Sequence, residues 1–532
     1  MKKLIAVLLA ALMCASILMA CGGGGNTGST AAPSQESKGS QESQQSSQEE
    51  QTTDDSGHDA DWPAETYKAV FILYVPQDGW AGTERVKSYI KELTKKDLNI
   101  ECEIVPMTFS TYNAQIPMML SAKEQIDVLS VSNALLQYDQ GYIVNLMDYL
   151  PQIEDALQII GKEEIMDTVT DGLLLTLPWQ LERTHRYGMA MRTDLLEKSG
   201  FDPKTINDEG VDAAFDKAGE IFAKIKEDNP GMVVMGGPQS SLIPNNTQHT
   251  HAPGNNYGVL DNYGAELTCV NYYETDYYMM ANSYMRKWYE AGYIQQDIAV
   301  SQDSYESLVK AGNTFGGCCP MKPDSYAEKR DQCNYDMTIF YFREDLMTAY
   351  NTLGTGYTVS GTAKDKVQAA RLLNYVFTSR DFEDAINWGQ PGVDWVESPD
   401  NANTAMYPEG IDVSNAQWHN SYGWAYPNER IAHVWIGNDP EMYTRIYVEA
   451  EQKSHRTKAW GFQYNNSNVQ DTISALDNIV SEYQYQIACG ASADYEKLIK
   501  EFNDKMYKSG LQDVIDDKQK QLDDWAAKKG LK

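Results

Sequence analysis

Apolar and polar positions follow two alternating patterns through the first third of the chain. Short apolar runs typical of buried strands cover residues 69–75, 100–105 and 126–131. The segments between them, residues 83–93 and 112–121, are predicted as helices, and Thr83 is the expected N-cap of the first. Strands that alternate with helices of about ten residues predict βαβ units and a parallel sheet.

The carboxyl ends of these strands are the first candidate site. Ligands of open α/β sheets bind outside the carboxyl ends of the strands. Those ends are predicted at residues 77–80 and 130–133, which contain Trp80 and Asn133.

A different apolar pattern opens the chain. Lys2 and Lys3 precede an uncharged, mostly apolar run at residues 4–18. A basic start followed by a short apolar run predicts a signal peptide, residues 1–20, because the run is shorter than the about 20 residues of a membrane span. Leu18-Met19-Ala20-Cys21 resembles the lipobox of bacterial lipoproteins. The alternative is an ordinary signal peptide with an incidental cysteine.

The lipobox resemblance implies a lipid anchor. In that family the cysteine is diacylated and becomes the new N-terminus, which assigns this role to Cys21. Two acyl chains anchor a protein stably. Residues 21–61 then form the lipidated N-terminus and a tether, whose Gly, Ser and Gln content is too polar to bury a core. We expect the mature protein on the extracytoplasmic face of the cell membrane.

Charge and cysteine content narrow the function classes. The chain has 532 residues and a net charge of −32, which argues against nucleic-acid partners and against charge-driven adhesion to anionic lipid. Membrane contact is therefore expected through the lipid alone. No C-x-x-C occurs, which disfavours zinc and thioredoxin-like sites. A Cys319–Cys333 disulfide and buried free thiols remain open alternatives.

Catalytic and metal motifs are scarce in the sequence. H-E-x-x-H, Walker A and G-x-S-x-G motifs are absent. His249 and His251 alone are a weak metal site, so we expect no metal, no cofactor and no enzyme activity.

Several motifs, taken in order, resemble family 1 extracellular solute-binding proteins. They are Leu177-Pro178-Trp179, the Arg-x-Asp-Leu-Leu segment at 192–200, Tyr289–Ile294, the strand-to-helix return at 360–382, the Trp-Gly segment at 387–395, and Gly461–Tyr464. One departure is Pro391, where many members carry an acidic residue. The Trp-Gly segment and the C-terminal region resemble a sugar-importer subgroup with a C-terminal extension.

The resemblance implies an α/β, two-lobe, periplasmic-binding-protein-like (type II) fold with a hinge. Its lobes are discontinuous. Lobe 1 is expected at 62–186 plus 350–392, and lobe 2 at 187–349 plus 393–532, with a C-terminal helical extension that includes a helix from Asp494 to Trp525. Closure of the lobes on a ligand, rather than catalysis, is the implied mechanism.

Aromatic residues supply the candidate ligand contacts. The chain has 34 Tyr, 12 Phe and 11 Trp, and a ring covers the C–H face of a sugar while polar side chains bond its hydroxyls. The candidates are Trp179, Trp388, Trp80, Trp395, Trp424 and Trp435, with Asn133 and Arg192 as polar contacts. Core packing is the alternative for each tryptophan. Trp179 and Trp388 are favoured because they lie in predicted turns near the lobe crossings.

The predicted function is capture of a carbohydrate, such as an oligosaccharide, and its delivery to the permease subunits of an ABC importer. Two alternatives remain. A surface glycan hydrolase would use a pair of acids, which the abundant carboxylates do not exclude. A carbohydrate-binding sensor lipoprotein would bind without transport.

Overall fold

The computed structural model describes residues 61–531 except 78, 170, 181–182, 239–255, 261–263, 302, 324, 344–345 and 348–354. Cys21, His249 and His251 lie outside the described residues, so the lipid-anchor and histidine predictions are not tested by the structure. Among the described helices, none has the length and apolar character that crossing a membrane requires.

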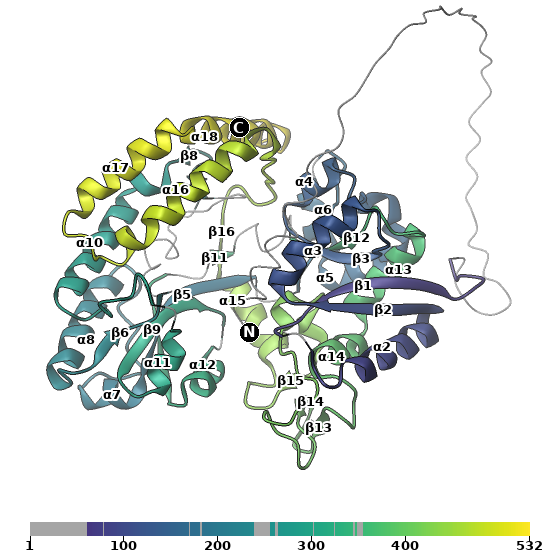
Figure 1. The fold of residues 1–532 in the computed structure, drawn as a ribbon, viewed down its shortest axis with the longest axis horizontal. Coiled ribbons are helices and arrows are strands. Elements are labelled where there is room, and N and C mark those ends of the chain that lie inside the picture. The colour runs from purple at the N-terminus through teal and green to yellow at the C-terminus, as the bar shows by residue number, and fades with distance from the viewer. Residues whose placement is uncertain are drawn as a thin grey trace, which may run out of the picture. The chain divides into compact units, whose positions relative to one another are not determined.

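The first lobe is built on a five-stranded sheet in the order β2-β1-β3-β12-β4 (Figure 1). Its strands are β1 (Tyr67–Tyr74), β2 (Ile100–Met107), β3 (Val128–Val131), β12 (Gly356–Val359) and β4 (Leu177–Pro178). β1 pairs in parallel with β2 and β3, as predicted. β12 is antiparallel to β3 and β4, so the sheet is mixed. Apolar runs alone do not specify strand direction, and β12 returns from the second lobe.

Helices pack on this sheet, and the first two lie at the residues predicted to be helical, 83–93 and 112–121. They are α2 (Thr83–Leu98), α3 (Phe109–Ser121), α4 (Ala134–Asp139), η1 (Leu146–Ile153), α5 (Glu154–Ile160), α6 (Lys162–Thr168), α13 (Lys366–Thr378) and α14 (Arg380–Trp388). The predicted cap was wrong: Gly82 is the N-cap of α2, and Thr83 is its first helical residue. The Thr83 hydroxyl instead donates to the Trp80 carbonyl at 2.7 Å.

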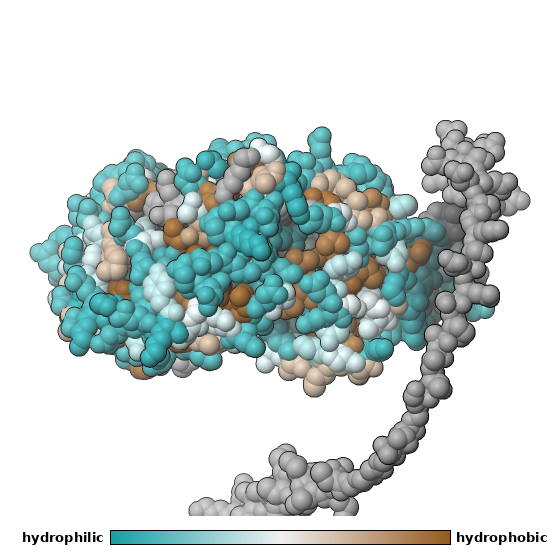
Figure 2. Space-filling view, turned by 90° about the horizontal axis from the view of Figure 1, so that it is seen from above, coloured by the Kyte–Doolittle hydropathy of each residue, from teal (hydrophilic) through white to brown (hydrophobic). Residues whose placement is uncertain are grey.

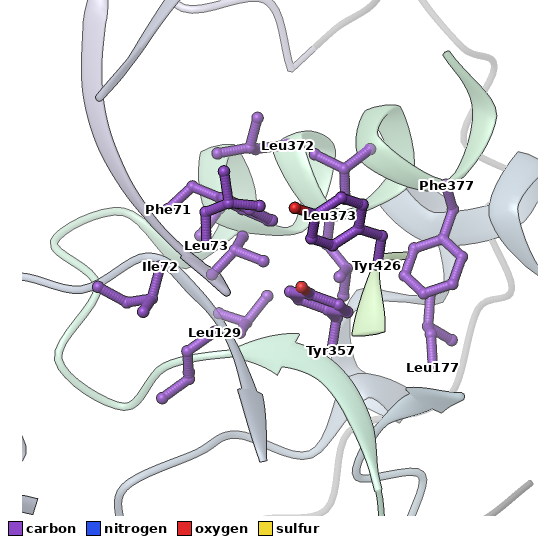
Figure 3. Packing of buried hydrophobic residues seen from close by; sticks show 14 of the residues in the cluster. Phe71, Ile72, Leu73, Leu129, Leu177, Tyr357, Leu372, Leu373, Phe377 and Tyr426 are labelled. Carbon is purple, nitrogen blue, oxygen red and sulfur yellow. The ribbon is translucent and has the colours of Figure 1, made fainter. Parts of the chain in front are cut away.

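The core of the first lobe joins distant parts of the sequence (Figure 3). Phe71 of β1 stacks on Tyr357 of β12, with ring centroids 5.4 Å apart. Leu372 and Leu373 of α13 pack in the same cluster. Tyr426 also belongs to it, with Trp418 and Ala425. This differs from the predicted placement of residues 393–532 in lobe 2, because helical and strand periodicity does not reveal which core a loop-rich segment covers.

The second lobe contains a six-stranded sheet. Its path is β16-β11-β5-β9-β6, and β10 also pairs with β5. The strands are β5 (Thr184–Arg192), β6 (Val233–Met235), β9 (Thr314–Met321), β10 (Met337–Tyr341), β11 (Leu346–Met347) and β16 (His455–Arg456). The helices around it are α7 (Thr193–Lys198), α8 (Ala214–Asp228), α10 (Asp276–Glu290), α11 (Tyr305–Lys310) and α12 (Tyr326–Cys333).

A C-terminal helical layer packs on this lobe (Figure 1). It consists of α16 (Gln470–Ala488), α17 (Tyr495–Lys508) and α18 (Leu511–Lys528), with η9 (Ser467–Val469) before them. The single helix predicted from Asp494 to Trp525 is two helices, because Gly510 has φ 99° and separates them. The layer packs on β7 (Val259–Leu260), β8 (Cys269–Val270) and η4 (Tyr272–Glu274).

A third, smaller sheet follows β12 and precedes β16 along the chain. It has β13 (Val396–Ser398), β14 (Asn401–Met406) and β15 (Val434–Trp435), followed by α15 (Tyr447–Lys453). Short helical turns within it are η6 (Gly423–Ala425), η7 (Glu429–Ile431) and η8 (Met442–Ile446).

The described cysteines resolve the two alternatives left open by the sequence. Cys102, Cys269, Cys318, Cys319, Cys333 and Cys489 are all free and buried, so the structure has no Cys319–Cys333 disulfide. The Cys319 thiol instead lies 3.3 Å from the Tyr305 hydroxyl. Figure 2 shows a largely hydrophilic face with scattered hydrophobic residues.

Candidate ligand-binding cleft

Four aromatic rings from three segments of the first lobe form a continuous group. The Trp424 ring stacks on Phe109 at 5.4 Å with an interplanar angle of 10°. It meets Trp179 edge-on at 6.4 Å and Tyr422 at 4.9 Å. The Trp424 side chain is 39% exposed, so part of this large ring faces solvent. An exposed ring supported by other rings is suited to contact the apolar face of a ligand.

Trp179 is held at the predicted strand end. Its indole N–H donates to the Ser130 hydroxyl at 3.0 Å. Ser130 lies in β3, within the segment that sequence analysis placed at the carboxyl edge of the sheet. The Pro178–Trp179 turn and the end of β3 therefore meet, and this bond fixes the orientation of the half-buried ring.

A cavity of about 410 Å³ continues from Trp424 and is lined from both lobes. On one side lie Trp388, Tyr422, Trp424, Trp435 and Tyr443, and on the other Lys322, Glu328, Asp331 and Gln332. The second group comes from the end of β9 and from α12 of the second lobe. A relative movement of the lobes would change the shape of this cavity.

Trp388 and Trp395 are buried, which differs from the expectation that these rings lie in surface turns. Trp388 is the last residue of α14 and is 4% exposed, and its indole donates to the His433 carbonyl at 3.1 Å. Trp395 is 6% exposed and donates to the Gly389 carbonyl at 3.1 Å. Trp388 and Trp435 have ring centroids 4.9 Å apart. Gly389 caps the end of the helix, but the Trp388 ring is buried, which makes Trp388 both a packing residue and a lining residue.

The three remaining candidates do not line this cavity. Trp80 is half-buried and donates to the Asn420 side chain at 2.8 Å. Asn133 is exposed at the start of α4 with φ 56°. Arg192 is buried; it pairs with Asp194 at 2.6 Å and lies 3.9 Å from the centre of the Tyr335 ring. Arg192 therefore orders the second lobe locally.

Two buried polar residues of the cavity wall were not found from the sequence. Glu429 and Asn387 are 4% and 1% exposed, and their Oε2 and Oδ1 atoms have no hydrogen-bond partner among the described residues. Burial raises the pKa of Glu429, while Lys322 and a hydrogen bond from Tyr443 oppose the rise. Gly423 leaves room for the carboxyl, since a Cβ there would lie 2.8 Å from Glu429 Cδ. No motif marks either residue.

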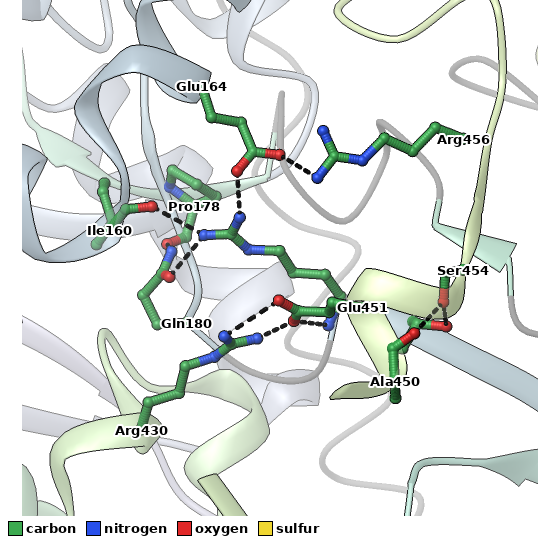
Figure 4. Close-up of polar contacts among 11 residues, drawn as sticks. Ile160, Glu164, Pro178, Gln180, Arg430, Ala450, Glu451, Ser454 and Arg456 are labelled. Carbon is green, nitrogen blue, oxygen red and sulfur yellow. Dashed lines mark hydrogen bonds and ion pairs between the residues drawn. The ribbon is translucent and has the colours of Figure 1, made fainter. Parts of the chain in front are cut away.

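The connections between lobes meet at a charged cluster (Figure 4). Arg183 lies between β4 of the first sheet and β5 of the second. Its guanidinium bonds Glu164 of α6 at 2.8 Å, the Ile160 carbonyl at 2.9 Å and Gln180 at 3.0 Å. Its backbone N–H donates to Glu451 of α15 at 3.1 Å.

Two more arginines complete the cluster. Arg430 of η7 forms an ion pair with Glu451, and Arg456 of β16 pairs with Glu164 at 3.0 Å. Burial and the nearby Arg430 charge lower the pKa of Arg183, and both glutamates oppose this. The cluster joins α6 of the first lobe to α15 and β16, at the place where the chain crosses from β4 of the first sheet to β5 of the second.

No group of three or more metal-ligating side chains suited to an ion occurs among the residues that the structure describes. The cleft therefore presents rings, carboxylates, amides and one lysine to a ligand. These groups suit recognition of a polar molecule with apolar faces.

Comparison with known proteins finds relatives of this chain by sequence and by structure. A family described as a domain of unknown function, DUF3502, matches residues 458–527, the C-terminal helical layer. A carbohydrate ABC transporter substrate-binding protein of Streptococcus pneumoniae serotype 4 (strain ATCC BAA-334 / TIGR4) is 22% identical over 469 residues, which cover 87% of this chain and 92% of that protein.

Solved structures show the same fold. The N-glycan transport solute binding protein NgtS from Streptococcus pneumoniae superposes with a TM-score of 0.74 at 19% identity, covering 87% of this chain and 100% of that one. NgtS in complex with Man1GlcNAc gives a TM-score of 0.67 at 20% identity, covering 86% and 99%. The chain therefore has the two-lobed fold of the extracellular solute-binding proteins, as its motifs predicted.

Proposed function

We propose that this chain is a lipid-anchored extracellular solute-binding protein that captures a carbohydrate between its lobes and delivers it to an ABC importer. The observation that carries the proposal is the exposed Trp424 ring, supported by Phe109 and Trp179, at the mouth of a cavity that both lobes line. Names of proteins with the same fold support it: one is a carbohydrate transporter component, and another was solved with a glycan.

The mechanism is closure without chemistry. A ligand that touches Trp424 on one side and α12 on the other binds the closed state better than the open state. It therefore shifts the population toward closure by its differential affinity. The permease subunits then recognise the closed form. The hinge cluster around Arg183 is the pivot, because it joins the segments that cross between lobes.

A thermal-shift screen over sugars tests the capture step. A carbohydrate present at 100 times its dissociation constant should stabilise the fold by about 2.7 kcal/mol, which raises the melting temperature. The same samples, analysed after incubation, should return the sugar intact. Stabilisation by no sugar, or turnover of the stabilising one, would contradict the proposal.

The anchor gives a separate prediction. Cys21→Ala should release the protein from the membrane fraction or leave its signal peptide uncleaved, because lipid on Cys21 is the proposed attachment. Fractionation followed by mass measurement of the N-terminal peptide checks this, with Cys102→Ala as the control. A processed Cys21→Ala protein that stays in the membrane fraction would contradict the lipid anchor.

A further inference from the structure

A second cavity, of about 260 Å³, adjoins the cavity at Trp424. Lys322, which follows the end of β9, lines both cavities. Within η8, Met442 and Tyr443 line the first cavity. Arg445 and Ile446 of the same short helix line the second. Two separate segments of the chain thus pass from one cavity to the next, which makes the cavities neighbours.

The second cavity also lies between the second lobe and the segment that follows the third sheet. The second lobe supplies Arg186 of β5 and Tyr341 of β10, and the Arg186 guanidinium lies 4.4 Å from the centre of the Tyr341 ring. The helix α15 supplies Glu449, Ala450 and Lys453. A ligand that contacts both walls of this cavity adds to the differential affinity that favours closure.

The charged groups around the second cavity are paired with one another and still reach solvent. The Lys453 ammonium lies 3.8 Å from the Glu449 carboxylate, and their side chains are 74% and 49% exposed. Arg445 pairs with Glu441 at 2.8 Å and is 45% exposed. A hydroxyl group both donates and accepts hydrogen bonds, so an exposed acid beside an exposed base is suited to bind it.

The sizes of the two cavities bear on the length of the ligand. The first, of about 410 Å³, lies within the range of about 300–1,000 Å³ that is typical for one small ligand. We propose that the second cavity is an additional sugar subsite, and that the ligand is an oligosaccharide longer than a disaccharide, extending from Trp424 past Lys322 to Tyr341 and α15. This inference rests on the proposed carbohydrate binding and specifies the chain length of the ligand.

Titration with sugars of increasing length tests the subsite. The probes are oligomers of mannose, of glucose and of N-acetylglucosamine, from dimer to hexamer, titrated calorimetrically into the mature chain. In a series that binds, the hexamer should bind at least about tenfold more tightly than the dimer. Trp424→Ala should weaken binding at every length, because this ring lies at the first cavity.

Two variants remove the second cavity without changing the first. The Glu449→Ala, Lys453→Ala double variant removes the exposed acid and base, and Ala450→Phe fills the space beside them. Each should reduce the gain from dimer to hexamer to about twofold or less while the affinity for the dimer stays the same, because none of these residues lines the first cavity.

The helix α17 provides a matched control. Lys500 and Asp504 form a pair with the same spacing of four residues, their side chains are 74% and 64% exposed, and neither lines a described cavity. The Lys500→Ala, Asp504→Ala double variant should keep the full gain with length. Both double variants should melt like the wild type, since exposed pairs add little to stability. If Ala450→Phe melts at a much lower temperature, the Glu449→Ala, Lys453→Ala variant alone decides.

The possible failures are distinguishable. Equal affinity for dimer and hexamer in every series that binds overturns the inference and leaves carbohydrate capture standing. A gain with length that persists in a folded variant of the second cavity does the same. Absence of binding in all three series also overturns it, and the thermal-shift screen over other sugars then decides whether the proposed function survives.

Discussion

Replacing Arg183 by methionine should lower the free energy of unfolding by about 3–5 kcal/mol, because it removes a buried charge that pairs with Glu164 and bonds the Ile160 carbonyl and Gln180. The Arg183 side chain is 8% exposed and contacts Glu164 and Gln180 directly. Its loss leaves the more exposed Arg456 as the remaining ion-pair partner of Glu164 among the described residues. Chemical denaturation with wild type and variant at pH 7 measures the difference.

Arg445 provides a matched control for this prediction. It pairs with Glu441 at 2.8 Å, but its side chain is 45% exposed. Exposed ion pairs contribute about 0–1 kcal/mol, so Arg445→Met should change the free energy of unfolding by no more than that. Similar small losses in both variants would mean that the hinge cluster is not a buried structural unit.

Trp424→Ala should weaken carbohydrate binding about five- to 150-fold while the melting temperature changes little. The ring removed is large, and loss of its contact area corresponds to about 1–3 kcal/mol of binding free energy. Its 39% exposure means that less packing is lost from the protein than on removal of a fully buried ring. Calorimetry with the best sugar from the screen, on samples whose melting is also recorded, gives both quantities.

Two other tryptophan variants serve as controls for the effect of Trp424→Ala on affinity and stability. Trp388→Ala removes a 4% exposed ring and should cost about 3–5 kcal/mol of folding stability. Trp62→Ala removes a ring that contacts Arg371 and does not line the cavity, so affinity should be unchanged. Normal affinity in Trp424→Ala would remove this ring from the binding site.

The first half of the first lobe was predictable from sequence because its patterns are local. β1, α2, β2, α3 and β3 follow apolar runs and helical segments in direct succession. The direction of β12 was not predictable, since it depends on a chain that returns from the other lobe. Placement of Tyr426 in the first core likewise depends on contacts more than 300 residues apart in sequence, such as its hydroxyl to the Tyr74 carbonyl.

The residue type of the candidate site was predictable from the sequence, but its geometry was not. Loop tryptophans pointed to a ligand surface, and Trp179, Trp388, Trp424 and Trp435 lie at or near the cavity. These tryptophans differ in how much of each ring is exposed, and the exposed fraction cannot be read directly from the sequence. Glu429 and Asn387 were missed because a buried acceptor without a partner is a property of the folded wall and has no motif.

Lobe closure on a sugar is the central claim, and small-angle scattering tests it most directly. The unacylated mature chain is measured alone and with the best-binding oligosaccharide at saturation, confirmed by calorimetry on the same stock. Closure about the Arg183 region should reduce the radius of gyration, and the oligosaccharide should be recovered intact. A radius of gyration that stays the same at saturation would contradict capture by closure.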